Sequence, residues 1–432
     1  MPHSGGAGRL ASGPIGCTAM RDAPQAVAVT GLGVVSPIGV GRDAFWKALC
    51  AGASGIAPLA ATEARVPRLA AKIPEYTSRD FIRSNHLRRA DALSRSIVCS
   101  ARMALADAGI EDGALPADRI GIVVGSALGN LRESAQYLER VFVKGVSLAS
   151  PMMFPNLVLN AAASYAAMEL GCTGANLTVS QGEVSGEQAI ALACDCIRAG
   201  RADVVLAGGG DEIAKILVAA YRDQRALSSQ RGGAEWCSPY DVDRNGVIMG
   251  EGAAMLALES AQHARRRGGR IYAEIMDYVS LGVPAPVYDW PAIAPAAAPP
   301  LQTLLLRGLG SSARGAVDLV CGSANGSRRL DACELDVLTR VFGEAGAQIA
   351  LTSIKGAIGE FGAAGALTAV AACLALHDGM VPPLSNLRRP PADAPFRFAS
   401  RTAEARPLQQ ALMLSMARGG SGVGLLLRRP SA

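Results

Sequence analysis

The chain has 432 residues, of which 50% are apolar and only 4% aromatic, so a large core must be packed from small aliphatic side chains. Its net charge of +5 is mild and comes from 37 arginines against 5 lysines, and we expect no nucleic-acid partner. Short basic clusters such as Arg328-Arg329 are interpreted as solvated faces, with docking of an acidic partner as the alternative. The ten cysteines form no CxxC pair and have no histidine at ligand spacing. This pattern supports neither a zinc site nor a disulfide framework, and it predicts reduced thiols in the cytoplasm with no metal or cofactor.

Taken in chain order, the first segment, residues 1–25, is rich in Gly, Ser, Ala and Pro without an apolar core, so we expect a disordered tail and no signal peptide, and Met20 could be the true start. Strand-like apolar runs then alternate with helical patterns, which predicts an α/β fold. The runs fall into two sets of similar order, which suggests an internal duplication with halves at 26–260 and 261–432. The expected strands are Val27–Gly31, Ile120–Gly125, Leu177–Val179, Val204–Ala207 and Ala253–Leu258, then Ile271–Met276, Leu319–Gly322, Ala350–Ser353, Ala411–Ser415 and Val423–Leu427.

Three segments outside these runs carry expectations of their own. The glycine-rich stretch Thr30–Pro37 lacks the full dinucleotide-binding fingerprint and is interpreted as a tight turn that packs a strand against a helix. The segment Val283–Pro300 holds six prolines and is predicted to be a surface loop. The apolar stretch Gly362–Leu376 is too short to cross a bilayer, so we expect a buried helix and no membrane insertion.

The stretch from Asn176 to Glu212 predicts a strand, a sharp turn, a helix and a second strand ending at three glycines. Catalytic cysteines favour such a turn, because the N-terminus of the helix lowers the pKa of a thiol. In this chain the position holds a carboxylate, Glu183.

Three motifs stand in this order between residues 27 and 259: "VAVTGLGVVSPIGVGRDAFWKALCAGASGI", "ADVVLAGG" and "CSPYDVDRNGVIMGEGAAMLALE". Together they resemble the elongating β-ketoacyl-acyl-carrier-protein synthases from about Val27 to Leu427. The resemblance implies a thiolase-like fold, a five-layer α/β/α/β/α sandwich built from two similar halves and working as a dimer. It also implies that the strand leading into the nucleophile pairs with its mate across the dimer axis.

In active members of that family a Cys is acylated by an acyl carrier protein, and two His residues assist decarboxylation and condensation of a malonyl thioester. Aligned by motif, the Cys position is Glu183, the first His is Ser323 and the second His is Glu360. The family's Lys is retained as Lys355, which we expect to hold the fold through a buried ion pair with Glu360 or another acid. The family's Gly-Phe-Gly-Gly gate becomes Ala417–Gly420 and loses its Phe.

None of the four histidines falls in these motifs; they are His3, His86, His263 and His377. We therefore expect no condensing activity from the chain by itself. The first hypothesis is a subunit like a chain-length factor that pairs with an active ketosynthase, or with itself, and shapes the acyl tunnel. Its setting would be type II polyketide, aryl-polyene or fatty-acid-type synthesis, with an acyl carrier protein as a further partner.

Two alternatives remain open from the residues. One is changed chemistry, such as a malonyl-thioester decarboxylase or a hydrolase, that uses Glu183 or Glu360 as acid and base. The other is an ordinary synthase whose nucleophile lies elsewhere, for example at Cys321, although core packing explains that thiol equally well.

Overall fold

The computed structural model of the protein describes residues 25–59, 68–230, 232–287 and 289–431. The expected disordered tail at 1–25 therefore lies almost wholly outside the described residues, as do Met20 and His3. Hydrogen bonds join the main strands in the order β13-β11-β10-β15-β16-β9-β1-β8-β7-β5-β6. These strands are β1 (Val27–Ser36), β5 (Ile120–Gly125), β6 (Asn176–Val179), β7 (Val204–Asp211), β8 (Gly252–Ser260), β9 (Ala273–Gly282), β10 (Leu319–Cys321), β11 (Ala350–Thr352), β13 (Arg397–Phe398), β15 (Gln410–Met416) and β16 (Ser421–Arg428).

Two groups of five strands share one topology. The first group is β1, β5, β6, β7 and β8, and the second is β9, β10, β11, β15 and β16. When the strands of each group are numbered 1 to 5 along the chain, their spatial order in the sheet is 1-5-4-2-3 in both groups. In each group the second strand is parallel to the third and fourth, and the fifth is antiparallel to the fourth and the first. All ten predicted runs form these ten strands, so the expected duplication is present in the fold. The proposed boundary at residues 260 and 261 lies between β8 and α7 (Ala261–Arg266).

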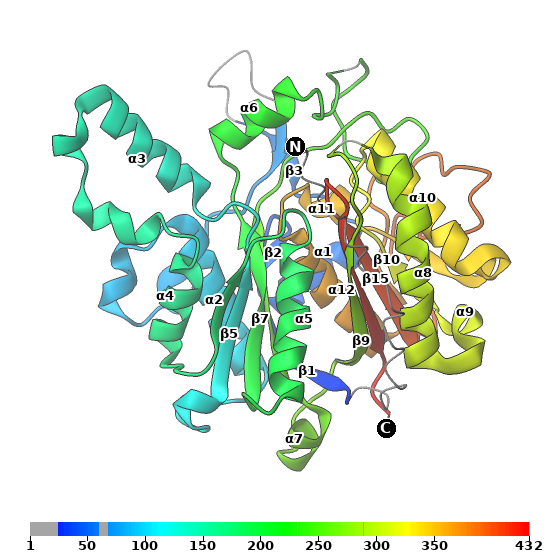
Figure 1. Ribbon diagram of the computed structural model, residues 1–432, viewed down its shortest axis with the longest axis horizontal. Coiled ribbons are helices and arrows are strands. Elements are labelled where there is room, and N and C mark those ends of the chain that lie inside the picture. Colours follow the sequence, from blue (N-terminus) through cyan, green and yellow to red (C-terminus); the bar gives the residue numbers. More distant parts are fainter. Residues whose placement is uncertain (1–24, 60–67, 231, 288, 432) are drawn as a thin grey trace, which may run out of the picture.

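Helices lie on both sides of each half of the sheet and make a five-layer sandwich (Figure 1). The outer layer beside the first half contains α2 (Ala92–Asp107) and α4 (Ala161–Leu170). The outer layer beside the second half contains α8 (Trp290–Leu309) and α10 (Arg328–Phe342). Between the two halves lie α5 (Ser185–Arg198), which contacts β7 and β16, and α12 (Ala364–Asp378), which contacts β8 and β15. The remaining α-helices are α1 (Arg42–Cys50), α3 (Leu131–Lys144), α6 (Lys215–Asp223), α9 (Ala313–Ala316) and α11 (Lys355–Ile358).

The predicted buried helix is confirmed, because every residue from Ala364 to Leu376 in α12 is buried. A helix that is apolar on all sides belongs in the interior of a large fold, and here it fills the layer between the two halves. Within the described part of the chain, no helix combines the length and the apolar character that crossing a membrane requires.

The expected turn at Thr30–Pro37 is wrong, since β1 continues without a break to Ser36. The expected close packing of the segment against a helix is present. A Cβ atom on Gly31 would lie 2.0 Å from the carbonyl oxygen of Ala104, and one on Gly33 would lie 1.9 Å from that of Ser100. The glycines therefore serve the approach of the α2 backbone to the strand, and no turn is needed.

The expected surface loop at Val283–Pro300 is also wrong over most of its length, because α8 begins at Trp290. Pro291 lies in the first turn, where the missing N–H costs nothing, but three further prolines lie inside the helix. One face of α8 buries apolar side chains such as Ile293, Leu301 and Leu304 against α10 and β9. This burial outweighs the proline penalty, which a reading of local propensity alone cannot anticipate.

Candidate functional site

Glu183 lies on the sharp turn between β6 and α5, as the sequence predicts. Gly182 takes a left-handed backbone conformation there, with φ of 59°. The Ser185 hydroxyl fixes the turn by donating to the carbonyl oxygen of Gly182 at 2.7 Å and accepting from the amide of Gln181 at 2.9 Å. Only 17% of the Glu183 side chain is exposed, so the carboxylate needs a partner.

That partner is Arg418, in the turn between β15 and β16. Its Nε donates to Glu183 Oε1 at 2.7 Å, its Nη2 donates to the same oxygen, and its backbone amide reaches Oε2 at 3.3 Å. The guanidinium also lies over the Tyr221 ring at 4.4 Å from the centroid and donates to Gln224 Oε1 at 3.0 Å. Burial acts to lower the pKa of Arg418, but Tyr221 and Glu183 outweigh it and hold the pKa above its usual value.

This pairing differs from what the turn alone implies for Glu183. The N-terminus of a helix favours a negative charge, yet the hydrogen bonds of the Glu183 carboxylate run to Arg418 and to the Tyr221 hydroxyl at 3.4 Å. The same neighbourhood raises the pKa of the Tyr221 phenol, first through burial and then through the charge of Glu183. Two departures from the family pattern, an acid for the Cys and an arginine for the gate Phe, thus lie in direct contact.

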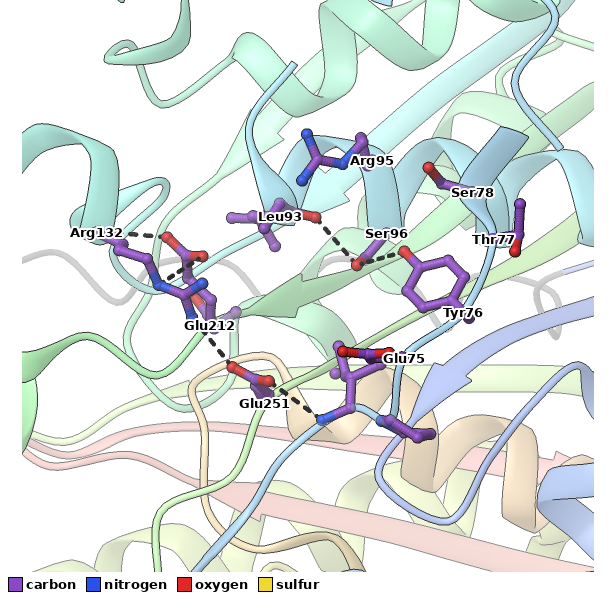
Figure 2. A pocket seen from close by; sticks show the side chains of 15 residues that line it. Glu75, Tyr76, Thr77, Ser78, Leu93, Arg95, Ser96, Arg132, Glu212 and Glu251 are labelled. Atoms are coloured by element: carbon purple, nitrogen blue, oxygen red, sulfur yellow. Dashed lines mark hydrogen bonds and ion pairs between the residues drawn. The ribbon is translucent and has the colours of Figure 1, made fainter. Parts of the chain in front are cut away.

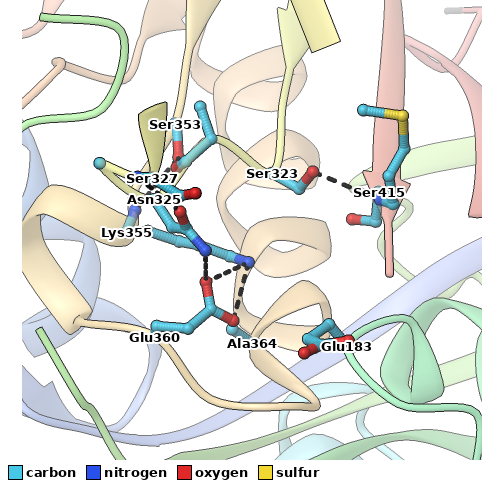
Figure 3. Close-up of polar contacts among 12 residues, drawn as sticks. Glu183, Ser323, Asn325, Ser327, Ser353, Lys355, Glu360, Ala364 and Ser415 are labelled. Atoms are coloured by element: carbon cyan, nitrogen blue, oxygen red, sulfur yellow. Dashed lines mark hydrogen bonds and ion pairs between the residues drawn. The ribbon is translucent and has the colours of Figure 1, made fainter. Parts of the chain in front are cut away.

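Ser323, at the first His position, is buried just after β10 and faces away from Glu360 (Figure 3). Its hydroxyl donates to Glu334 Oε1 at 3.0 Å and accepts from the Met416 amide at 3.3 Å. Glu334 also accepts from the Ser323 amide at 2.6 Å and from the Tyr240 hydroxyl at 2.6 Å. Burial raises the pKa of Glu334 above its usual range. The serine therefore belongs to a buried network that ties β10 to α10.

The expected ion pair between Lys355 and Glu360 is present (Figure 3). Lys355 Nζ lies 2.9 Å from Glu360 Oε2 and 3.2 Å from Oε1, and Asn325 Nδ2 donates to Oε2 at 2.6 Å. The two side chains are only 4% and 1% exposed. Burial acts to lower the pKa of Lys355, but the charge of Glu360 outweighs it, so the net shift is upward.

One cavity of about 130 Å³ brings most of these residues together, and we call it the mouth cavity. Glu183, Arg418, Lys355 and Glu360 all line it, while Ser323 lies outside its lining. Both carboxylates in the mouth cavity are held by a fixed cation, and three more arginines surround them. These are Arg225, Arg328 and Arg329.

The other candidate residues lie outside the mouth cavity. Cys321 is buried at the end of β10, and burial raises the pKa of its thiol to about 12, so it stays protonated. His263 Nδ1 bonds Glu259 Oε2 at 2.6 Å, and His377 pairs with its neighbour Asp378. The side chain of His86 lies outside the described part of the structure. Among residues that the structure describes, no cluster of three or more His, Cys, Asp or Glu side chains is arranged to hold a metal ion.

A larger cavity of about 730 Å³ lies among residues 73–78, the start of α2, the start of α3, the end of β7 and the start of β8 (Figure 2). Arg132 bridges two carboxylates there, at 3.4 Å from Glu212 and 3.3 Å from Glu251. Burial raises the pKa of Glu212 to about 7, even though the Arg132 charge acts to lower it. No motif pointed to this cavity, because its charges come from five separate segments.

Two buried features of the site were also not predicted from the sequence. Glu187, one turn beyond Glu183, is fully enclosed and bonds Ser415, while its Oε2 atom has no hydrogen-bond partner. The second buried feature is the contact of Arg418 with Glu183, and the sequence does contain a hint of it. Opposite charges stand at two positions where the family motifs have the uncharged residues Cys and Phe, and a buried charge needs a partner.

Comparison with known proteins supports the motif reading. Residues 25–264 match the family description "Beta-ketoacyl synthase, N-terminal domain", and residues 292–388 match "Beta-ketoacyl synthase, C-terminal domain". A 3-oxoacyl-[acyl-carrier-protein] synthase 2 of Rhizobium meliloti (strain 1021) is 33% identical over 93% of this chain and 98% of its own length. The granaticin polyketide putative beta-ketoacyl synthase 1 of Streptomyces violaceoruber is 31% identical over 94% of this chain and 98% of its own.

Solved structures agree with this. The ishigamide ketosynthase/chain length factor superposes with a TM-score of 0.87 and 27% identity, covering 95% of this chain and all of that one. A type II PKS acyl-carrier protein in complex with its ketosynthase bound to the hexaketide matches with a TM-score of 0.85 and 26% identity, covering 94% of this chain and all of that one. The duplicated topology, the motif order and these matches lead to one conclusion: the chain belongs to the beta-ketoacyl synthase family.

Proposed function

We propose that this protein is a subunit like a chain-length factor: it pairs with an active ketosynthase and shapes the acyl tunnel, and by itself it does not condense. The observation that carries the proposal is the ion pair of Glu183 with Arg418 at the nucleophile position. A carboxylate held by an arginine can neither take up an acyl group as a stable thioester nor release it in the way a thiolate does.

The two His positions support the same proposal. Condensation in the family needs imidazoles that stabilise the negative charge on the thioester oxygen. Here Ser323 is turned toward Glu334, and Glu360 is bound by Lys355 and Asn325. Neither residue is free to donate a proton into the mouth cavity.

The alternative reaction, decarboxylation or hydrolysis through Glu183 or Glu360, receives less support. An acid-base pair of carboxylates needs one group that is free to gain and lose a proton. Each of the two carboxylates is instead held by a cation, Arg418 in one case and Lys355 in the other. A nucleophile at Cys321 is disfavoured by its burial and by its raised pKa.

A partner surface is available for the proposed pairing. Helix α3 has no buried residue, and with the following segment up to residue 159 it forms an arm that projects from the body (Figure 1). Exposed apolar side chains cluster on this arm; they are Leu138, Phe142, Val143, Val146, Leu148, Met152, Phe154, Val158 and Leu159. Large apolar side chains exposed together on one segment are typical of a protein interface. Leu177, on β6 at the edge of the sheet, is also exposed, where the family resemblance implies pairing across the dimer axis.

The partner we propose is an active ketosynthase subunit, with a homodimer when the chain is expressed alone. Solved relatives include a ketosynthase/chain length factor and a ketosynthase bound to its acyl-carrier protein, and an acyl carrier protein is the second partner we propose. The setting we propose is type II polyketide, aryl-polyene or fatty-acid-type synthesis in the cytoplasm.

Co-expression with a tagged ketosynthase from the same gene cluster tests the pairing. We expect stoichiometric co-purification, because an obligate interface of this kind buries more than roughly 2,000 Å². Phe142→Glu places a charge on the arm and should abolish pairing, whereas Leu306→Glu on α8 is the matched control. The two side chains are 82% and 56% exposed, so neither change disturbs the core. A strictly monomeric chain, or a homodimer that ignores the ketosynthase, would end the proposal.

Incubation with acyl carrier protein thioesters tests the loss of acylation. We expect intact-protein mass spectrometry to show no stoichiometric acyl adduct on this chain, because Glu183 forms no stable thioester. An adduct at stoichiometric level would contradict this, whatever the outcome of the pairing experiment.

A further inference from the structure

The arm is joined to the body at residues 126–132, and we call this segment the root. Beyond the root, α3 buries none of its residues, and its main contacts are with α6 and with a short helical turn of the arm itself at Val146–Leu148. Asn130 in the root adds one hydrogen bond, from its Nδ2 to Asp91 Oδ2 at 3.0 Å. With so little apolar burial, the position of the arm depends on the polar contacts of the root.

Arg132, the second residue of α3, makes most of these polar contacts. Its backbone amide donates to Glu212 Oε1 at 3.2 Å, and its Nε lies 3.4 Å from Glu212 Oε2. Its Nη2 donates to the carbonyl oxygen of Ile213 at 3.0 Å and to Glu251 Oε2 at 3.3 Å (Figure 2). One residue therefore ties the start of the arm to the end of β7 and to the residue before β8.

The two carboxylates that Arg132 contacts differ in their other partners. Glu251 also accepts from the backbone amides of Ile73 at 3.1 Å and Ile213 at 3.2 Å. Within the described part of the chain, every hydrogen bond and ion pair of the Glu212 carboxylate comes from Arg132. When the root opens, the Glu212 carboxylate therefore loses its partner, whereas Glu251 keeps two donors.

Glu212 lines the cavity of about 730 Å³ together with exposed residues such as Glu75, so an opened root brings the carboxylate into contact with water. Charged groups surround Glu212 on several elements. Those that act on it most are Arg132 on α3, Asp91 at the start of α2 and Glu251 before β8. The other charged residues that line this cavity or a smaller one beside it are Glu75, Arg95, Asp211, Glu183 and Arg418.

This setting changes how tightly Glu212 holds a proton. With the root closed, burial raises the pKa of Glu212 from 4.5 to about 7, and the charge of Arg132 only partly offsets the rise. With the root open, the carboxylate is in water and its pKa returns toward the usual 4.5. The closed root binds the proton more tightly, so it is favoured at low pH. This preference is lost as the pH rises from about 4.5 to about 7.

We infer that Arg132 and Glu212 form a latch at the root of the arm, and that uptake of a proton by Glu212 closes it. The latch sets how firmly the arm is held for a partner subunit, because a surface that must first be ordered is bound more weakly. This consequence for pairing rests on the proposed function, whereas the latch is a property of the chain itself. Arg132 and Glu212 are positioning residues, since they act on pairing through the arm.

Hydrogen–deuterium exchange followed by mass spectrometry tests the latch on a peptide that covers residues 129–137. Phe142→Glu is the background, because its charge keeps a second copy of the chain from covering the arm. After correction for intrinsic exchange, the root should open about tenfold more at pH 8 than at pH 6. Adding Glu212→Gln should abolish this ratio, because the glutamine side chain does not titrate. Adding Glu139→Gln, at an exposed position of α3, is the matched control and should preserve the ratio.

A ratio near one in the Phe142→Glu background, or a ratio that Glu212→Gln leaves unchanged, would overturn the latch. Helix α12 is the internal reference, because its residues from Ala364 to Leu376 are all buried. The root should exchange far faster than α12 at both pH values. Equal protection would mean that the root opens only when the whole chain unfolds, and the latch would again be overturned.

Two arginine variants test the other half of the latch in the same background. Arg132→Met should increase opening of the root at both pH values, because the contacts to β7 and to Glu251 are lost. Arg140→Met, at an exposed position further along α3, is the matched control and should leave the root unchanged. Equal opening in the two variants would overturn the role of Arg132.

The affinity for the ketosynthase partner tests the regulation. Between pH 6 and pH 8, wild type should lose affinity relative to Glu212→Gln by up to about tenfold. Both proteins bind the same partner, so the partner's own titration cancels in this comparison. The same pH dependence in wild type and Glu212→Gln would overturn the regulation of pairing. If wild type pairs at neither pH, the proposed function fails, while the exchange experiment still decides whether the latch exists.

Discussion

The two ion pairs of the site differ in how deeply they are placed and in how many partners share them. Lys355 and Glu360 are 4% and 1% exposed, and Asn325 is their further neighbour. Glu183 and Arg418 are 17% and 23% exposed, and Tyr221 and Gln224 offer the guanidinium alternative contacts. The Lys355–Glu360 pair, which we call the deep pair, is part of the packing of the second half. The Glu183–Arg418 pair, which we call the shallower pair, joins one turn of each half and can change with less loss of stability. The proposed motif alignment, in which Lys355 is the family's Lys and Glu183 takes the place of its Cys, fits this division.

The largest effect we expect concerns catalysis at the shallower pair. Glu183→Cys should give no chain elongation by the chain alone, because each missing oxyanion donor costs roughly 10²–10³ in rate and both imidazoles are absent. Product analysis by mass spectrometry with malonyl- and acyl-carrier proteins is the measurement. Glu183→Cys/Arg418→Phe, which also restores the family's gate residue, is the companion variant. Elongation by either variant would show that the loss of function is confined to the nucleophile corner.

Breaking the deep pair should have the largest effect on stability. Lys355→Met leaves the Glu360 carboxylate buried without its cation, which typically costs about 3–5 kcal/mol. Urea unfolding followed by circular dichroism measures the loss. In Lys355→Met/Glu360→Leu both charges are gone, so most of the stability should return. If Lys355→Met were as stable as wild type, the deep pair would contribute nothing to the stability of the fold.

A third ion pair, Arg132 with Glu212, extends the comparison to intermediate depth, with side chains 37% and 6% exposed. The folded state raises the pKa of Glu212 from 4.5 to about 7, so it binds the proton more tightly than the unfolded chain does. The stability from this group is complete below about pH 4.5 and is lost as the pH rises to about 7. Glu212→Gln stays neutral and should gain stability relative to wild type between pH 5 and 8, on the order of 1–3 kcal/mol. Chemical unfolding across this range is the measurement, and Glu139→Gln on the exposed face of α3 controls for the loss of one carboxylate. A difference between Glu212→Gln and wild type that does not change with pH would contradict the prediction.

The sequence was sufficient for the strands, because each is a short run of β-branched and aliphatic residues bounded by glycine or polar turns. It failed at α8, where three internal prolines argue against a helix and only tertiary burial argues for one. In the site, motif order pointed to Glu183, Lys355 and Glu360, and all three line one cavity. The contact with Arg418 spans 235 positions and depends on how two turns meet. Local pattern carries no information about such a distance, and only the paired opposite charges at two motif positions hint at the contact.

The smallest effect we expect is the coupling within the shallower pair. Glu183→Gln and Arg418→Gln keep the size of each side chain and remove its charge. Each should cost about 1 kcal/mol, because partial exposure lets water replace part of the lost interaction and Tyr221 still covers the guanidinium position. The double variant completes a cycle whose interaction energy we expect near the low end of the roughly 0.5–3 kcal/mol found for residues in contact. Urea unfolding of all four proteins under one condition provides the numbers, and the cycle for Lys355 and Glu360 is the internal reference. A coupling for the shallower pair equal to that of the deep pair would mean that the Glu183–Arg418 pair holds the fold together, and the difference in depth would then carry no functional meaning. A coupling near zero would mean that Glu183 and Arg418 act as independent charges. A small but measurable value, with the fold intact in all variants, is what a replaceable ion pair at the nucleophile turn requires.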